Sequence, residues 1–173
     1  MSDTSPAAQA VQDEIHRRMS GEKRLKLATA VTADLFIVSS PNWRVYGLDR
    51  RTGQVRWTTK GSGPYDRGVV AINDVAITAG DAGRPGLRRR HGAQRWKVNV
   101  GGNVLVPLTP YGKAVLAVTG RLWAVSADGN LLWRHDAGET VPYSTGARVQ
   151  NDIIYIGTSY GDKIGFFALR APD

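Results

Sequence analysis

The amino-acid sequence predicts an all-β repeat fold that follows a single N-terminal helix. One observation is a glycine followed four positions later by a tryptophan, which occurs in Gly53–Trp57, Gly92–Trp96 and Gly129–Trp133. The tryptophans are therefore 39 and 37 residues apart, and a period of about 38 is typical of structural repeats. The other observation is that short runs rich in Val, Ile, Leu, Thr and aromatic residues alternate with turn pairs such as Asn-Asp and Asp-Gly. That texture is typical of consecutive antiparallel strands.

The predicted helix lies at residues 6–20. Pro6 suits the first helical position, and apolar side chains recur every four residues from Val11 to Met19. After this segment the helical pattern does not return. We therefore divide the chain into an N-terminal helix and cover segment, residues 1–27, and a repeat domain, residues 28–173.

The strand pattern recurs in register four times within the repeat domain. Each copy starts with a turn pair and an apolar strand: "ADLFIVSS" (33–40), "NDVAITAG" (73–80), "GKAVLAVTG" (112–120) and "NDIIYIGTS" (151–159). A second strand follows each time, and in three copies the glycine turn and the tryptophan strand come next. The sequence thus predicts about four units, the last without its outermost strand. In the second copy, Pro85 and Gly86 fall inside a strand, which is expected to be irregular or at a sheet edge.

A unit of about 38 residues with three or four short strands has the size of one β-propeller blade. The glycine supplies the positive φ that a tight hairpin turn needs, and the tryptophan then lies where its ring can pack against the next blade. The structural docking residues are predicted to be Gly53, Trp57, Gly92, Trp96, Gly129 and Trp133. Trp96 is expected to stabilise the fold least, because its repeat is the poorest copy.

The segment "VYGLDRRTGQVRW" resembles the repeat of the pyrroloquinoline quinone (PQQ)-like β-propeller family, in which Ala-x-Asp precedes x-x-Thr-Gly-x-x-x-Trp. Asp49, Thr52, Gly53 and Trp57 match that pattern in the first copy, and the third copy keeps Ala124, Gly129 and Trp133. The resemblance covers roughly residues 28–169. It implies a fold more than an activity, because the family includes dehydrogenases, outer-membrane assembly lipoproteins and kinase sensor domains. Full-length members resemble rings of seven or eight blades.

The family dehydrogenases are similar in holding their quinone with a vicinal disulfide, a stacking tryptophan and a calcium ion bound by Glu, Asn and Asp. This chain has no cysteine and no glutamate between Glu22 and Glu139. Its histidines, His16, His91 and His135, lack metal-ligand spacing, and no nucleophile elbow or phosphate-binding loop occurs. We therefore predict no catalytic residue, no metal site and no cofactor. Four aspartates are interpreted as turn residues: Asp34, Asp74, Asp128 and Asp152.

The formal charge of +8 is concentrated in one region, because no Asp or Glu occurs between Ala82 and Ala127. The candidate anion-binding residues are Arg84, Arg88, Arg89, Arg90, Arg95 and Lys97. Clustered arginines around an aromatic residue hold phosphates and stack on bases, which favours a nucleic acid or another polyanion as ligand. The competing interpretation is a solvated blade surface, because alternate strand positions point to opposite faces of a sheet.

The sequence as a whole predicts a non-enzymatic binding or scaffold module with a protein partner. The alternatives are a polyanion-binding domain and a degenerate quinoprotein-related domain without catalysis. The first 20 residues hold no apolar signal region, and no apolar stretch of 18 residues occurs. We therefore expect no membrane span and a cytoplasmic location.

Four blades leave the backbone of the terminal strands and the apolar faces of the end sheets uncovered. Either residues 1–27 cover one end, with Leu25 and Leu27 inward, or two chains form an eight-bladed homodimer. The homodimer is favoured, because most oligomers have two-fold symmetry.

Overall fold

The structure is a computed structural model that describes residues 28–31, 34–61, 65, 67–79, 84–88, 91–104, 106–138, 142–160 and 163–170. The described part of the chain is all-β, with four antiparallel sheets. The helix predicted at residues 6–20 and the cover segment 1–27 lie outside the described residues.

Strands that are adjacent in the sequence are hydrogen-bonded neighbours within every sheet. Sheet I consists of β1 (Ala28–Val31), β2 (Leu35–Ser40), β3 (Arg44–Asp49) and β4 (Val55–Lys60). Sheet II consists of β5 (Val69–Ile72), β6 (Val75–Thr78), β7 (Arg84–Arg88) and β8 (Gln94–Val98). Sheet III consists of β9 (Thr109–Tyr111), β10 (Ala114–Val118), β11 (Leu122–Ser126) and β12 (Leu131–His135). Sheet IV consists of β13 (Arg148–Gln150), β14 (Ile153–Tyr160) and β15 (Lys163–Arg170).

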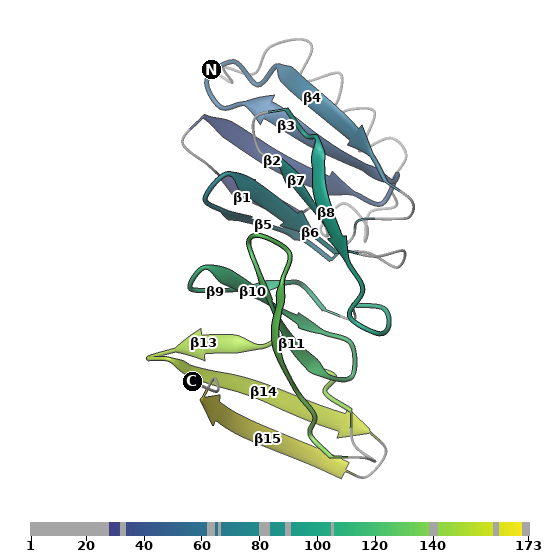
Figure 1. Cartoon of the computed structure of the whole chain (residues 1–173), viewed down its shortest axis with the longest axis vertical. Coiled ribbons are helices and arrows are strands. Elements are labelled where there is room, and N and C mark those ends of the chain that lie inside the picture. The colour runs from purple at the N-terminus through teal and green to yellow at the C-terminus, as the bar shows by residue number, and fades with distance from the viewer. Residues whose placement is uncertain are drawn as a thin grey trace, which may run out of the picture.

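The four sheets follow one another along the long axis of the molecule in sequence order (Figure 1). The first strands of sheets I and II lie side by side, as do those of sheets III and IV, since β1 contacts β5 and β9 contacts β13. Among the described residues, sheet IV has three strands.

The core lies between consecutive sheets, and the second strand of each sheet contributes to it most. In β6, Ala76 packs towards sheet I, whereas Val75 and Ile77 pack towards sheet III. In β10, Val115 packs towards sheet II and Leu116 towards sheet IV. Because both faces are covered, these strands need apolar residues at every position, which explains their continuous apolar runs.

The second copy of the repeat decides between the two alternatives predicted for the strand that contains Pro85 and Gly86. This strand, β7, lies between β6 and β8 and is therefore not at an edge, but it is irregular, because its pairing with β8 shifts register after Gly86. Its pairing with β6 ends at Gly86, and Pro85 is paired only with Lys97 of β8. The proline is thus accommodated in a central strand because the ladder on one side stops before it.

Candidate binding site

Two of the three repeat tryptophans join their own sheet to the turn of the next one. Trp57 in β4 is only 8% exposed, and its ring lies so close to Gly92 that a methyl group there would collide with it. Thr59 of the same strand donates a hydrogen bond of 2.6 Å from Oγ1 to the Gly92 carbonyl. The turn glycines Gly53, Gly92 and Gly129 have φ values of 68°, 67° and 88°.

Trp96 repeats this arrangement one sheet further along. A methyl group on Gly129 would lie 2.6 Å from the Trp96 ring, and Trp96 Nε1 donates a 2.9 Å hydrogen bond to the Ala127 carbonyl. Trp133 instead meets Tyr111 edge-on, with ring centroids 6.3 Å apart. Among the described glycines, none lies against the Trp133 ring.

The tryptophan stands opposite a small residue of the third strand in all three sheets that have a fourth strand. The pairs are Gly47 with Trp57, Gly86 with Trp96, and Ala124 with Trp133. Each pairing is followed by a register shift that leaves the residue before the tryptophan unmatched. Such a bulge increases the local twist and redirects side chains.

Asp49 holds the glycine turn of sheet I. Its Oδ1 accepts hydrogen bonds from the amides of Arg51 and Thr52 at 2.9 and 2.8 Å, and Oδ2 accepts one from the Arg56 guanidinium at 2.6 Å. The Arg56 guanidinium, followed by these turn donors, lowers the pKa of the Asp49 carboxyl well below its ordinary value. The matched Asp-x-x-Thr-Gly residues therefore stabilise a turn.

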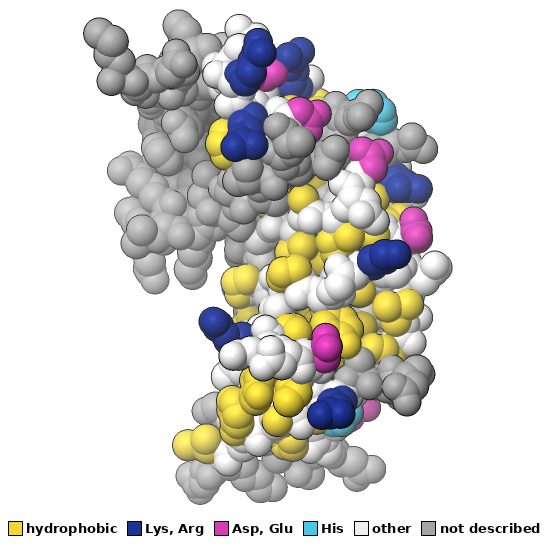
Figure 2. Space-filling view, turned by 90° about the vertical axis from the view of Figure 1, so that its left-hand side faces the viewer, with side chains coloured by type: hydrophobic (Ala, Val, Ile, Leu, Met, Phe, Trp, Pro, Cys, Tyr) yellow, Lys and Arg dark blue, Asp and Glu magenta, His cyan; other side chains and the backbone are white. Residues whose placement is uncertain are grey.

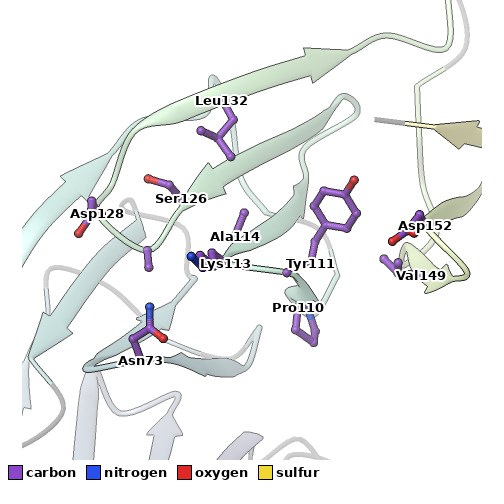
Figure 3. A pocket seen from close by; sticks show the side chains of 12 residues that line it. Asn73, Pro110, Tyr111, Lys113, Ala114, Ser126, Asp128, Leu132, Val149 and Asp152 are labelled. Carbon is purple, nitrogen blue, oxygen red and sulfur yellow. The ribbon is translucent and has the colours of Figure 1, made fainter. Parts of the chain in front are cut away.

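An open pocket of about 610 Å³ lies where turns of sheets II, III and IV meet. Figure 3 shows Asp128 and Asp152 on opposite sides of it. Residues that line it include Asn73, Tyr111, Lys113, Ser126, Asp128, Leu132 and Asp152. Asn73, Lys113 and Asp152 belong to the turn between the first and second strands of three successive sheets. The repeat therefore places polar groups from three sheets around one opening.

The pocket combines both charges with an apolar surface. Lys113 and Asp128 are exposed, as is the unmatched bulge residue Leu132, at 54%. Tyr111 and Val149 contribute further apolar surface. Such a mixture suits a polypeptide segment, which offers backbone donors, charged groups and apolar side chains together.

Sequence reasoning treated Asp128 and Asp152 as turn residues only and did not single out Lys113, Tyr111 or Leu132. The sequence signal that could have found them is the alignment of the four repeats, which places the turn residues of each copy at equivalent positions. Neither the opening between sheets nor the bulge at Leu132 can be derived from that register.

Neither Arg95 nor Lys97 of the basic segment is among the described residues that line this pocket. Arg84 and Arg88 belong to β7, and Arg95 and Lys97 are exposed on β8. Arg89 and Arg90 lie outside the described residues. The only basic residue among those lining the pocket in the described part of the chain is Lys113.

Within the described residues, no three His, Cys, Asp or Glu side chains are grouped so that they could hold a metal ion. The ring of His135 shares a hydrogen bond of 2.8 Å with the hydroxyl of the buried Tyr143. No helix in that part of the chain is long and apolar enough to cross a membrane.

Consecutive antiparallel sheets with this docking pattern define a β-propeller-type repeat protein. A family model described as outer membrane protein assembly factor BamB matches residues 41–170, and the chain belongs to this family of PQQ-like repeats. No curated protein matches the chain significantly.

Solved structures share the fold. BamB from Moraxella catarrhalis is 20% identical with a TM-score of 0.68, and the alignment covers 82% of this chain and 45% of that one. The computationally designed Ika8 protein is 13% identical (TM-score 0.65; 82% and 45% covered), and the designed Ika4 protein is 13% identical (TM-score 0.66; 82% and 89% covered). The chain thus spans less than half the length of the BamB and Ika8 chains and most of the Ika4 chain.

Proposed function

We propose that the chain is a non-enzymatic β-propeller binding module, in which four blades, the last incomplete, present a pocket to a protein partner. Family membership over residues 41–170 carries the proposal, because the family description is that of an assembly factor. Assembly factors act by binding other proteins. The fold alone does not select this function, since 493 chains of solved structures match it.

The pocket at the turns of sheets II to IV supports this proposal. Lys113 and Asp152 offer opposite charges for orienting a partner, and Leu132 projects an apolar side chain beside them. Hydrophobic side chains also gather in the lower half of the face shown in Figure 2, towards sheets III and IV. Exposed apolar surface rimmed by polar groups is typical of protein interaction sites.

Site-specific photo-crosslinking tests the proposal. A benzophenone amino acid at Leu132 should yield one discrete adduct with a partner protein in cells that express the natural gene. The same group at Gln54, which is exposed on the distant turn of sheet I, is the matched control. Equal adducts from both positions, or none from Leu132, would contradict a binding site at the pocket.

Polyanion binding remains a second candidate, favoured by the exposure of Arg95 and Lys97 on β8. Two other basic residues, Arg121 and Arg134, are neutralised in part, since they lie 2.6 and 3.9 Å from the Asp136 carboxylate. The cytoplasmic location stays a prediction that fractionation of expressing cells would test.

A further inference from the structure

Sheet IV has a face and an edge on which no described sheet or strand packs. Ile154, Ile156 and Phe167 point towards sheet III and belong to the core cluster there. The alternate residues form what we call the open face of sheet IV: Arg148, Tyr155, Ile164, Phe166, Ala168 and Arg170. On it, Ile164 is 84% exposed and Phe166 is 74% exposed, with the Phe166 ring stacked on Tyr155 at 6.0 Å.

In sheets I, II and III, a fourth strand pairs with the outer edge of the third strand, which is the edge left open in sheet IV. In sheet III, Leu116 of the second strand pairs with Ala124, and Ala124 pairs with Trp133 of the fourth strand. In sheet IV, Tyr155 pairs with Ala168 in the same register. Ala168 is exposed, so the small residue that elsewhere faces a tryptophan here faces solvent.

The contacts of the repeat tryptophans also point to a fourth strand at this edge. Trp57 and Trp96 each rest on the glycine turn that precedes the fourth strand of the next sheet. In sheet IV, the corresponding glycine turn would lie between β15 and an added fourth strand. Among the described residues, no glycine lies against the Trp133 ring, so this contact is also open. A strand that carries a glycine turn and a large aromatic residue would complete both arrangements.

The charge of the open face restricts the partner further. Arg148 and Arg170 are both exposed on it, and neither takes part in an ion pair between described residues. A groove of about 410 Å³ lined by Arg148, Tyr155 and Phe166 runs along this face. Arg170 lies on β15 itself, so a carboxylate beside the aromatic residue of an incoming strand would meet its guanidinium group. Arg148 and the groove lie towards β13, at the opposite edge of the sheet.

We propose that the outer edge of β15 binds an extended protein segment that adds a fourth strand to sheet IV. The segment places a large aromatic side chain opposite Ala168 and carries an acidic residue that faces Arg170. Main-chain hydrogen bonds along the edge supply affinity, and the position opposite Ala168 supplies specificity. The inference rests on the proposed binding function, since it names the form of the partner segment.

A synthetic peptide with the sequence of residues 127–137, "ADGNLLWRHDA", is a suitable probe, because it holds a glycine turn, a tryptophan and two flanking aspartates. Fluorescence anisotropy of the labelled peptide should show saturable binding to the purified chain. Replacing the peptide tryptophan by alanine should weaken binding at least about tenfold. Ala168→Trp in the protein should do the same, whereas Ala93→Trp, at an exposed turn of sheet II, should leave affinity unchanged.

Charge reversal provides a test that does not depend on packing. Arg170→Glu should weaken binding of the acidic peptide and strengthen binding of a version with lysines in place of both aspartates. Arg148→Glu, on β13 at the opposite edge of the sheet, is the matched control and should change neither affinity. Equal affinity for the tryptophan and alanine peptides, or no saturation at millimolar peptide, would overturn the proposal. So would light scattering that shows a homodimer dissociated by Ala168→Trp, because a second copy would then occupy the face. Crosslinking at Leu132 is measured separately, so loss of peptide binding alone leaves the proposed function standing.

Discussion

Replacing Gly92 by alanine perturbs the contact between sheets I and II at one atom. Gly92 has a φ of 67°, and an L-residue in that region costs about 1–2 kcal/mol. The added methyl group would also collide with the Trp57 ring, which is 8% exposed and has little room to move. Overpacking of this kind costs about 1–3 kcal/mol. We therefore expect Gly92→Ala to lower the free energy of unfolding by roughly 2–5 kcal/mol.

Gly112→Ala is the matched control for backbone strain. Gly112 has a φ of 56°, and an added methyl group would meet nothing within 4 Å. Its cost should therefore be the strain alone, about 1–2 kcal/mol. Urea unfolding followed by circular dichroism gives both values, with the slope of each transition checked for a two-state change.

A double-mutant cycle with Trp57→Ala isolates the contact itself. Trp57→Ala alone should cost about 3–5 kcal/mol, because a buried aromatic ring is lost. In that background Gly92→Ala should cost at least about 1 kcal/mol less than it does with the ring present. It should still cost more than Gly112→Ala, because the added methyl group also meets the Thr59 hydroxyl, which Trp57→Ala leaves in place. Costs of Gly92→Ala that are equal with and without the Trp57 ring would refute the docking account.

Three further predictions concern Trp133, Asp49 and the basic residues of β8. Trp133→Ala should destabilise less than Trp57→Ala, because Trp133 is only half-buried and lacks a glycine turn; equal urea midpoints for the two variants would contradict this. Asp49→Asn should lower the melting temperature at neutral pH. The difference should shrink as the pH falls below about 3.9, because the depressed pKa of Asp49 stabilises the fold only while the carboxyl is ionised; a pH-independent difference would argue against it. If polyanions bind β8, Arg95→Ser with Lys97→Ser should reduce the salt dependence of binding to a nucleic acid between about 50 and 200 mM salt, and an unchanged slope would exclude that surface.

The all-β fold and the repeat family could be predicted from local chemistry. The glycine-to-tryptophan spacing records a contact that recurs between sheets I and II and between sheets II and III, so it is visible in the sequence. It also suggests that Trp96 is the weakest of the three, because its copy is degenerate, and that ranking stays a prediction. The contacts favour Trp133 as the weakest, since no described glycine turn of the next sheet lies against its ring.

The candidate pocket could not be predicted in the same way. Asn73, Lys113 and Asp152 come from three repeats, and only the stacking of sheets II to IV brings them to one opening. The sequence predicted that β7 is irregular or at an edge but could not decide between the two, because proline occurs in both settings. Propensity describes single strands, whereas both features depend on how strands and sheets pair.

The affinity of the partner identified by crosslinking tests the central claim of a pocket-centred binding module most directly. Purified partner should bind the wild-type chain and bind a Lys113→Glu, Leu132→Asp variant at least about tenfold more weakly, with the same melting temperature. Gln54→Ala should leave the affinity unchanged. A pocket variant that binds the partner as tightly as the wild type would contradict the account.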